Sequence, residues 1–291
     1  MKTARMTAPW RPIPTGLTAP AFAPGSVWLV GAGPGDPGLL TLHAAHALTE
    51  ADVVLHDALV SPAVLALAGR ARLVAVGKRA GLRSPSQLRI NQRLIDLARQ
   101  GLRVVRLKGG DPLIFGRGSE EALALAAAGI PFRIIPGISA GIGGTAAAGI
   151  PLTHRHLARS VTFATGHDSG GGLTDTDWAG IGTGSDVLVL YMARGQIARI
   201  APRLIAAGRD GGEAVALIAN ATTPDQTVHL TTLAEAARAA LDPPDDAPVL
   251  IVIGPVVALR GMLTGWQQAE PMTIAAVPAP GIAPGITQAR G

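Results

Sequence analysis

The sequence predicts an α/β fold of two domains, and three observations support this. Short apolar runs alternate with amphipathic segments of helical spacing, a pattern typical of parallel sheets with helical crossovers. The length of 291 residues allows two domains, each with its own core. Four of the apolar runs also stop at glycine or charged residues, as expected where the strands of an open parallel sheet end beside a ligand.

The four runs are residues 27–30, 53–55, 73–76 and 104–107. They end, in the same order, at a glycine loop, at His56-Asp57, at Gly77-Lys78 and at Lys108-Gly109-Gly110-Asp111-Pro112. The last turn is the most informative. Two adjacent glycines allow positive φ and a close approach to backbone amides, and Asp111 adds an acceptor. Alone, this turn would fit equally well a tight strand-to-helix connection with a capping Asp. The recurrence at four strand ends favours a ligand site.

Helical spacing predicts helices at residues 39–48, 88–100 and 119–128, the last of them capped by Gly129. A fifth strand is expected at 131–135, followed by a break at Pro136-Gly137. We therefore predict an N-terminal α/β domain over residues 26–136 and a C-terminal α/β domain over 137–262. The proline-rich ends, residues 1–25 and 263–291, are expected to be flexible tails.

The second half has the same alternation but different motifs. Strands are expected at residues 160–165, 187–191, 214–218 and 249–253, and helices at 140–148 and 196–207, the latter ending at Gly208. The glycine-rich stretch 169–184 is expected to be a mobile loop.

Composition excludes several classes of function. Aromatic residues make up 3% of the chain, too few for a surface that stacks nucleic-acid bases, so no nucleic-acid partner is expected. The absence of cysteine excludes disulfides and thiolate chemistry and fits a cytoplasmic protein. None of the seven histidines falls in an H-E-x-x-H or similar ligand pair, so no metal site is expected. The uncharged stretch 134–153 holds too many glycines and prolines for a membrane helix. The net charge of +5 favours an anionic partner, and on charge alone a small polyanion fits as well as a nucleic acid.

The first glycine loop formally matches the dinucleotide-binding pattern through Gly33, Gly35 and Gly38. Pro34 and Pro37 remove backbone donors from this loop, and Asp36 places negative charge where a pyrophosphate would lie. The loop therefore suits a neutral or cationic ligand better than a dinucleotide.

The motifs GAGPGDPGLLT, DALVS, VGKRAG, VRLKGGDPLIFGRGSEE, PGISA, GIPLTHR and Tyr191-Met192 together resemble the tetrapyrrole methylases, over about residues 27–259. The resemblance implies two α/β domains with S-adenosylmethionine (SAM) in the cleft between them, and a homodimer. It implies C-methylation of uroporphyrinogen III on rings A and B, giving precorrin-2 through precorrin-1 for sirohaem or cobalamin synthesis. We expect this single activity, without a fused dehydrogenase-chelatase module.

The resemblance also implies roles for individual residues. Asp57 matches the family's proton acceptor and Lys78 its proton donor. From residue type alone, Asp57 would also serve as a helix cap, Lys78 as a surface amine and Met192 as core filler. The cofactor contacts carried over are Pro34, Gly109, Gly110, Asp111, Ile114, Ser139, Ala140, Met192 and Ala221.

The substrate's eight carboxylates would give the basic excess a purpose. Candidates for this contact are Lys78, Arg79, Arg83, Arg106, Lys108, Arg117, Arg155 and Arg159, with Arg117 and Arg155 the first choices. The sequence departs from the family pattern at Arg83, where relatives often have histidine, at Ala221, often glycine, and at His56, often tyrosine.

Three rival functions remain open. The first is methylation of a later precorrin, against which the GIPLTHR and KGGDPLIFGRG motifs weigh. The second is a nicotinamide-dependent oxidoreductase that uses the glycine loop, with Asp57 on the ribose. The third is a non-catalytic protein that binds a tetrapyrrole without transferring a methyl group.

Overall fold

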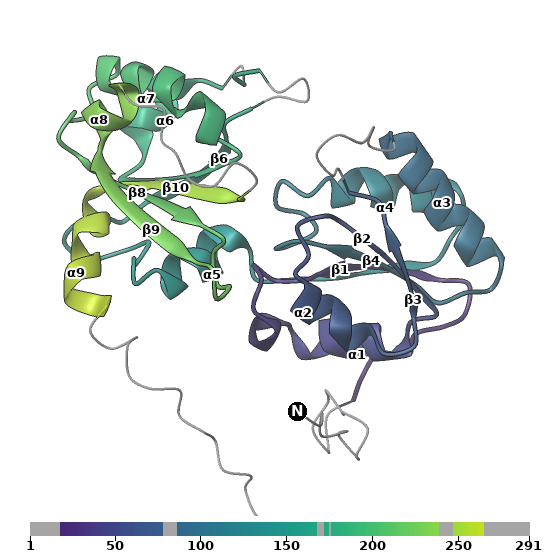
Figure 1. Cartoon of the computed structure of the whole chain (residues 1–291). Helices are drawn as coiled ribbons and strands as arrows, with labels where there is room; N and C mark the ends of the chain where they lie inside the picture. The colour runs from purple at the N-terminus through teal and green to yellow at the C-terminus, as the bar shows by residue number, and fades with distance from the viewer. Residues whose placement is uncertain (1–17, 78–85, 168–171, 175, 239–246, 265–291) are drawn as a thin grey trace, which may run out of the picture.

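The computed structural model describes residues 18–77, 86–167, 172–174, 176–238 and 247–264. Within them the chain forms two five-stranded sheets that lie side by side, each with helices on both faces (Figure 1). The predicted α/β class is confirmed. The predicted Lys78, Arg79 and Arg83, and most of both predicted tails, lie outside the described residues.

The first sheet is entirely parallel, with strand order β3-β2-β4-β1-β5. Its strands are β1 (Val27–Gly31), β2 (Val53–His56), β3 (Arg72–Ala75), β4 (Val104–Lys108) and β5 (Phe132–Ile135). The three central strands β2, β4 and β1 are buried along their whole length, whereas the edge strands β3 and β5 are largely exposed. This burial explains the continuous apolar runs that predicted them.

Two helices cover each face of the first sheet. α1 (Leu42–Glu50) and α2 (Pro62–Leu65) lie on one face, and α3 (Gln87–Arg99) and α4 (Gly118–Ala127) on the other (Figure 1). Side chains of Thr41, Ser61 and Ser86 cap α1, α2 and α3 by accepting a first-turn amide. Gly129 follows α4 with a φ of 69°, the left-handed position predicted for it.

The second sheet is mixed, with order β6-β7-β10-β8-β9. Its strands are β6 (Val161–Thr165), β7 (Val187–Tyr191), β8 (Ala214–Ala219), β9 (Thr227–Thr232) and β10 (Val249–Ile253). β6 and β7 are parallel, but β10 runs antiparallel to β7 and β8, and β9 runs antiparallel to β8. The alternation expected for the second half is present, but its strands form a mixed sheet instead of a parallel one. The sequence analysis also missed β9, whose residues are mostly exposed or half-buried.

Helices on the second sheet are α5 (Ala140–Ala147), α6 (Trp178–Gly184), α7 (Ile197–Ala206), α8 (Leu233–Arg238) and α9 (Arg260–Leu263). The prediction of a mobile loop at 169–184 was wrong for residues 178–184, because they form α6. Asp177 caps α6 by accepting the Gly180 amide at 2.9 Å, and Trp178 anchors the helix in the core at 3% exposure. No helix of the described ranges is long and apolar enough to cross a membrane.

Candidate active site between the two sheets

A cavity of about 870 Å³ lies between the two sheets and is lined by residues of both. All five strands of the first sheet point their carboxyl ends at the cavity. Strands β6, β7 and β8 of the second sheet do the same, because β6 is parallel to β7, and β7 and β8 are both antiparallel to β10. The loops after these strands form its walls. The four strand ends singled out in the sequence are therefore brought together. The volume is near the upper end for small-molecule sites.

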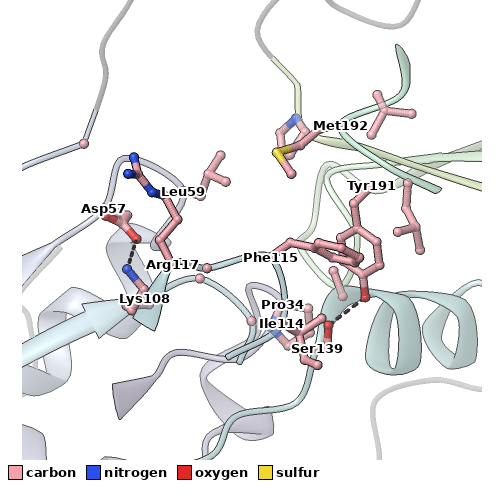
Figure 2. Close-up of a pocket in the computed structure, with 18 of the residues that line it drawn as sticks. Pro34, Asp57, Leu59, Lys108, Ile114, Phe115, Arg117, Ser139, Tyr191 and Met192 are labelled. Carbon is pink, nitrogen blue, oxygen red and sulfur yellow. Dashed lines mark hydrogen bonds and ion pairs between the residues drawn. The ribbon is translucent and has the colours of Figure 1, made fainter. Parts of the chain in front are cut away.

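Most of the predicted cofactor contacts line this cavity. They are Pro34, Gly109, Gly110, Ile114, Ser139, Ala140, Met192 and Ala221. Figure 2 shows Pro34, Ile114 and Ser139 on one side of it and Met192 across from them. Asp111 is the exception, since it does not reach the wall.

Asp111 instead ties two loops together. Its Oδ1 accepts the Leu113 amide at 2.8 Å, and its Oδ2 accepts the Gly137 amide at 3.0 Å. The carboxylate therefore holds the turn after β4 against the connection between β5 and α5. Through this clamp Asp111 fixes the shape of the Gly109-Gly110 turn, which does line the cavity.

Backbones approach each other closely behind this turn. Gly33 and Gly110 exchange amide hydrogen bonds, with N···O distances of 3.2 and 2.8 Å. A Cβ on Gly31 would lie 2.5 Å from the Cα of Gly137, so only glycine fits there. Because the Gly33 and Gly110 amides already bind each other, they are not free to bind a pyrophosphate. The loop therefore lacks the free amides that a dinucleotide's pyrophosphate would need. A glycine-lined groove beside apolar side chains instead fits a nucleoside-sized ligand without phosphates.

Tyr191, at the end of β7, joins the second sheet to α5. Its hydroxyl accepts the Gly141 amide at 2.8 Å and shares a 2.7 Å hydrogen bond with Ser139 Oγ (Figure 2). The Ser139 side chain does not cap α5 itself, so the tyrosine hydroxyl takes the place of a helix cap. Burial raises the pKa of Tyr191 above its ordinary value of 10.0. The hydroxyl therefore stays protonated at physiological pH.

Phe115 crosses from the first domain to reach Tyr191, with ring centroids 4.9 Å apart. Its φ is positive, and four other non-glycine residues of the described ranges share this strained conformation. The five residues are Phe115, Arg117, Met192, Asn220 and Thr222, with φ between 48° and 67°. Phe115, Arg117 and Met192 line the cavity, and the other two flank Ala221. Strain concentrated in this way is typical of a functional site. Ala221 itself does not have a positive φ.

A charged cluster forms part of the first-domain wall. Arg106 Nη2 contacts Asp57 Oδ1 at 2.5 Å, and Arg106 Nε contacts Glu121 Oε1 at 2.9 Å. Lys108 Nζ lies 3.1 Å from the same Glu121 oxygen and 3.8 Å from Asp57 Oδ2. Gln87 also donates to that Glu121 oxygen, at 3.1 Å. Asp57 is thus an ion-pair partner at the wall and not a helix cap, because Ser61 caps α2.

The basic residues divide into two groups. Arg106 and Lys108 line the cavity with side chains only 2–3% exposed, and both are paired with Asp57 and Glu121. Arg117 does line the cavity, paired with Glu120 through Nε···Oε1 and Nη2···Oε2 distances of 2.8 Å. This pairing raises the pKa of Arg117 and lowers that of Glu120. Arg155 is exposed and does not reach the cavity wall.

Glu121 and Tyr191 are the main site residues whose roles the sequence did not reveal. A signal existed for Glu121, since it shares a helix face with Leu125 and that face is buried. Arg106 gave a second signal, because it is a charged residue inside an apolar strand. Within the described residues, no group of three or more His, Asp or Glu side chains is placed to hold a metal ion.

Comparison with known proteins gives a consistent picture. Residues 26–237 match the family model of the tetrapyrrole (corrin/porphyrin) methylases. A uroporphyrinogen-III C-methyltransferase of Sinorhizobium is 57% identical over 250 residues, which is 84% of this chain and 88% of that protein. A sirohaem synthase of Yersinia enterocolitica is 52% identical over 87% of this chain, but the chain spans only 53% of its length.

Solved structures agree. The uroporphyrin-III C-methyltransferase of Thermus thermophilus in complex with S-adenosylhomocysteine superposes with a TM-score of 0.71 at 40% identity, covering 80% of this chain and 99% of that one. A cobalt-precorrin-4 methyltransferase of cobalamin biosynthesis gives a TM-score of 0.70 at 25% identity, covering 80% of this chain and 96% of that one.

Proposed function

The chain belongs to the tetrapyrrole methylase family, and from this premise we propose that it transfers methyl groups from SAM to uroporphyrinogen III. Two transfers, on rings A and B, give precorrin-2 through precorrin-1, for sirohaem or cobalamin synthesis. We further propose that it works in the cytoplasm as a homodimer.

One observation carries the proposal. The cavity between the sheets is walled by the same segments that resemble the family, and the relative sharing 57% of its residues over most of both chains is a uroporphyrinogen-III C-methyltransferase. The later-precorrin enzyme has the same fold but only 25% identity. The first methylation steps are therefore favoured over later ones.

The residues around the groove fit SAM as co-substrate. Its sulfonium supplies an electrophilic methyl group. Gly109, Gly110 and Ala221 offer close backbone approach, and Met192 is 42% exposed at the wall instead of buried in the core. A wall of this kind aligns two reactants and excludes water, the contributions on which methyl transfer depends most. We assign Pro34, Ile114, Ser139 and Ala140 to the same cofactor site.

Asp111 tests whether the turn after β4 holds the cofactor. We expect Asp111→Ala to abolish SAM binding, because it releases the Gly137 amide and the turn that lines the groove. Calorimetry with S-adenosylhomocysteine measures this directly. An unchanged affinity would refute the cofactor site at this turn.

The acceptor side is assigned from charge. Arg117 is available to a substrate carboxylate, since its pair with Glu120 is about half exposed and such pairs contribute little stability. We keep Arg155 as a second substrate contact that lies beyond the cavity wall. Asp57 reaches the cavity and accepts the proton released after methylation, and Lys78 is proposed as the proton donor.

The test is an anaerobic incubation of the purified chain with SAM and enzymatically generated uroporphyrinogen III, followed by mass spectrometry of the tetrapyrrole. We expect a gain of two methyl groups and formation of S-adenosylhomocysteine. A chain that binds SAM but leaves uroporphyrinogen III unchanged contradicts the assignment and directs the search to later precorrins.

A further inference from the structure

The charged cluster behind Asp57 has more members than a single proton acceptor needs. Arg106 and Lys108 stand two residues apart in β4, so they project from the same face of the sheet. Both contact one oxygen of Glu121, and both lie beside Asp57. Two cations and two carboxylates balance in formal charge. The cluster is therefore neutral with Lys108 as an ammonium and carries one net negative charge with Lys108 as the free amine, so that it can take up one proton.

The members of the cluster differ in exposure. The side chain of Asp57 is 28% exposed, that of Lys108 3%, and that of Glu121 is completely buried. Asp57 is thus the most exposed member of the cluster at the cavity wall. Lys108 Nζ lies directly behind it, 3.8 Å from Asp57 Oδ2 (Figure 2). This separation is beyond a hydrogen bond but within ion-pair distance, so the proton passes only when the two groups move closer together.

The surroundings of Lys108 favour loss of its proton. Burial lowers the pKa of its amine below the ordinary 10.5, and the neighbouring Arg106 cation lowers it further. Asp57 and Glu121 oppose this, and Glu120 is the other charged group that interacts with the amine. Because burial dominates, the neutral amine is populated at lower pH than in an exposed lysine.

We propose that Lys108 is a proton-relay residue acting through Asp57, so that the proton released at each methyl transfer passes from the tetrapyrrole to Asp57 and then to the Lys108 amine. This inference rests on the proposed function. Glu121 serves as a positioning residue, since its Oε1 accepts from Lys108, Arg106 and Gln87 and so holds the amine in place.

The step balances in atoms and charge. Each transfer breaks the methyl–sulfur bond of SAM, forms a carbon–carbon bond and leaves the tetrapyrrole as a cation that must lose one proton. An O–H bond forms on Asp57, and its proton then forms an N–H bond on Lys108. The result is an ammonium beside a regenerated Asp57 carboxylate, and release of the proton to water completes the turnover.

The first test compares Lys108→Arg with Lys108→Met. Arginine keeps the positive charge but does not give up a proton in proteins, so it cannot accept one. We expect both variants to lose about 10²- to 10⁴-fold in kcat. In the wild type, kcat rises with pH as the Lys108 amine becomes neutral, and both variants lose this rise. Unchanged S-adenosylhomocysteine affinity by calorimetry shows that the cofactor site is intact.

Other outcomes have distinct meanings. If Lys108→Arg keeps wild-type kcat and the same pH dependence, Lys108 supplies only charge and the relay is overturned, while the proposed function stands. If the wild type itself transfers no methyl group, both proposals fall. The same two substitutions at Lys78 serve as the comparison, because loss of the pH-dependent rise at Lys78 alone assigns the relay to that residue instead.

A second measurement needs no folded Lys108 variant. The chain contains three lysines, Lys2, Lys78 and Lys108, so lysine labelled with ¹³C at Cε gives few NMR signals to assign. We expect one to titrate below 10.5 and to move lower still in Asp57→Asn, because a carboxylate that stabilises the ammonium is lost. A Lys108 signal that titrates at 10.5 or above, or ignores Asp57→Asn, overturns the relay.

Discussion

The two walls of the cavity are built in different ways. The first-domain wall contains buried charge, with Arg106 2% exposed and Glu121 completely buried beside Asp57. The second-domain wall has the ring of Tyr191 and the thioether of Met192, held by a backbone with positive φ at Met192. The difference suggests a division of labour, in which one wall handles protons and the other shapes the space in which the reactants meet.

Each kind of wall is costly to maintain. Buried ions lose their hydration, and their mutual attraction repays this only when every partner is in place. Positive φ at a residue other than glycine costs about 1–3 kcal/mol. The amino end of the first sheet shows the ordinary alternative, since Asp52 there pairs with a partly exposed Arg103. The Arg106–Glu121 pair therefore carries a larger desolvation cost than the Arg103–Asp52 pair.

The largest effect is expected from a substitution of Asp57, the most exposed residue of the charged wall. We expect Asp57→Asn to lower kcat by about 10²- to 10⁴-fold, because the amide cannot accept the proton released after methylation. The affinity for S-adenosylhomocysteine should change little, since the cofactor contacts lie elsewhere in the cavity. Steady-state methyl transfer and calorimetry measure the two quantities on the same preparation.

Asp52→Asn provides the matched control. Asp52 and Asp57 flank the same strand β2, and each pairs with an arginine of the β4 segment, but Asp52 lies away from the cavity. We expect Asp52→Asn to keep wild-type kcat. If the two variants lose the same activity, Asp57 acts by stabilising the sheet, and the proton-handling wall is the wrong description.

The next effect concerns the second-domain wall. A Cβ on Gly141 would collide with the Tyr191 hydroxyl, so Gly141→Ala must displace either the ring or α5. We expect a loss of about 1–3 kcal/mol in the free energy of unfolding, the usual cost of overpacking, together with weaker cofactor binding. Urea denaturation provides the measurement. Gly184→Ala is the control, because its Cβ would meet nothing within 4 Å, and a loss equal to that of Gly141→Ala would contradict the argument.

Predictability from sequence differs between the two walls. Strand ends such as Asp57 and the Gly109-Gly110 turn were identified because a parallel sheet brings its carboxyl ends to one edge. The second sheet was predicted less well, since buried runs such as residues 249–253 look the same in parallel and antiparallel strands. The strand β9 was missed because its face is half-exposed and its residues polar.

Contacts between distant residues set the remaining limit. The buried ion pairs were missed because Arg106 was considered only as a contact for substrate carboxylates and Glu121 was given no role. Their pairing depends on how α4 packs against β4, and residue spacing does not report this. The Tyr191 hydroxyl likewise caps a helix 50 residues earlier. Asp111 was found for its acceptor, but its partner at Gly137 emerged only from the fold.

A smaller effect isolates the Tyr191 hydroxyl from its ring. Tyr191→Phe keeps the contact with Phe115 but leaves the Gly141 amide without its acceptor. We expect a loss of about 1 kcal/mol in unfolding free energy, the usual net contribution of one hydrogen bond, and a weaker affinity for S-adenosylhomocysteine because Ser139 is released at the cavity wall. Thermal unfolding and calorimetry test both. Full affinity would show that the ring alone shapes this wall.

The smallest effect is a gain in the free energy of unfolding instead of a loss. It tests whether the strained backbone at the second-domain wall contributes to ligand binding. Met192 has a φ of 52° and a side chain 42% exposed, so glycine would relieve strain and lose little burial. The left-handed conformation costs about 1–2 kcal/mol, and glycine's extra unfolded-state entropy offsets about 0.5–1 kcal/mol of the relief. We therefore expect Met192→Gly to raise the free energy of unfolding by about 0.5 kcal/mol while lowering the affinity for S-adenosylhomocysteine. Met262→Gly is the matched control, because Met262 is 70% exposed in the short helix α9, where glycine costs about 1 kcal/mol. Opposite signs for the two variants in urea denaturation would show that the strained wall exchanges stability for binding, whereas a loss in both would mean that the Met192 side chain holds its loop in place.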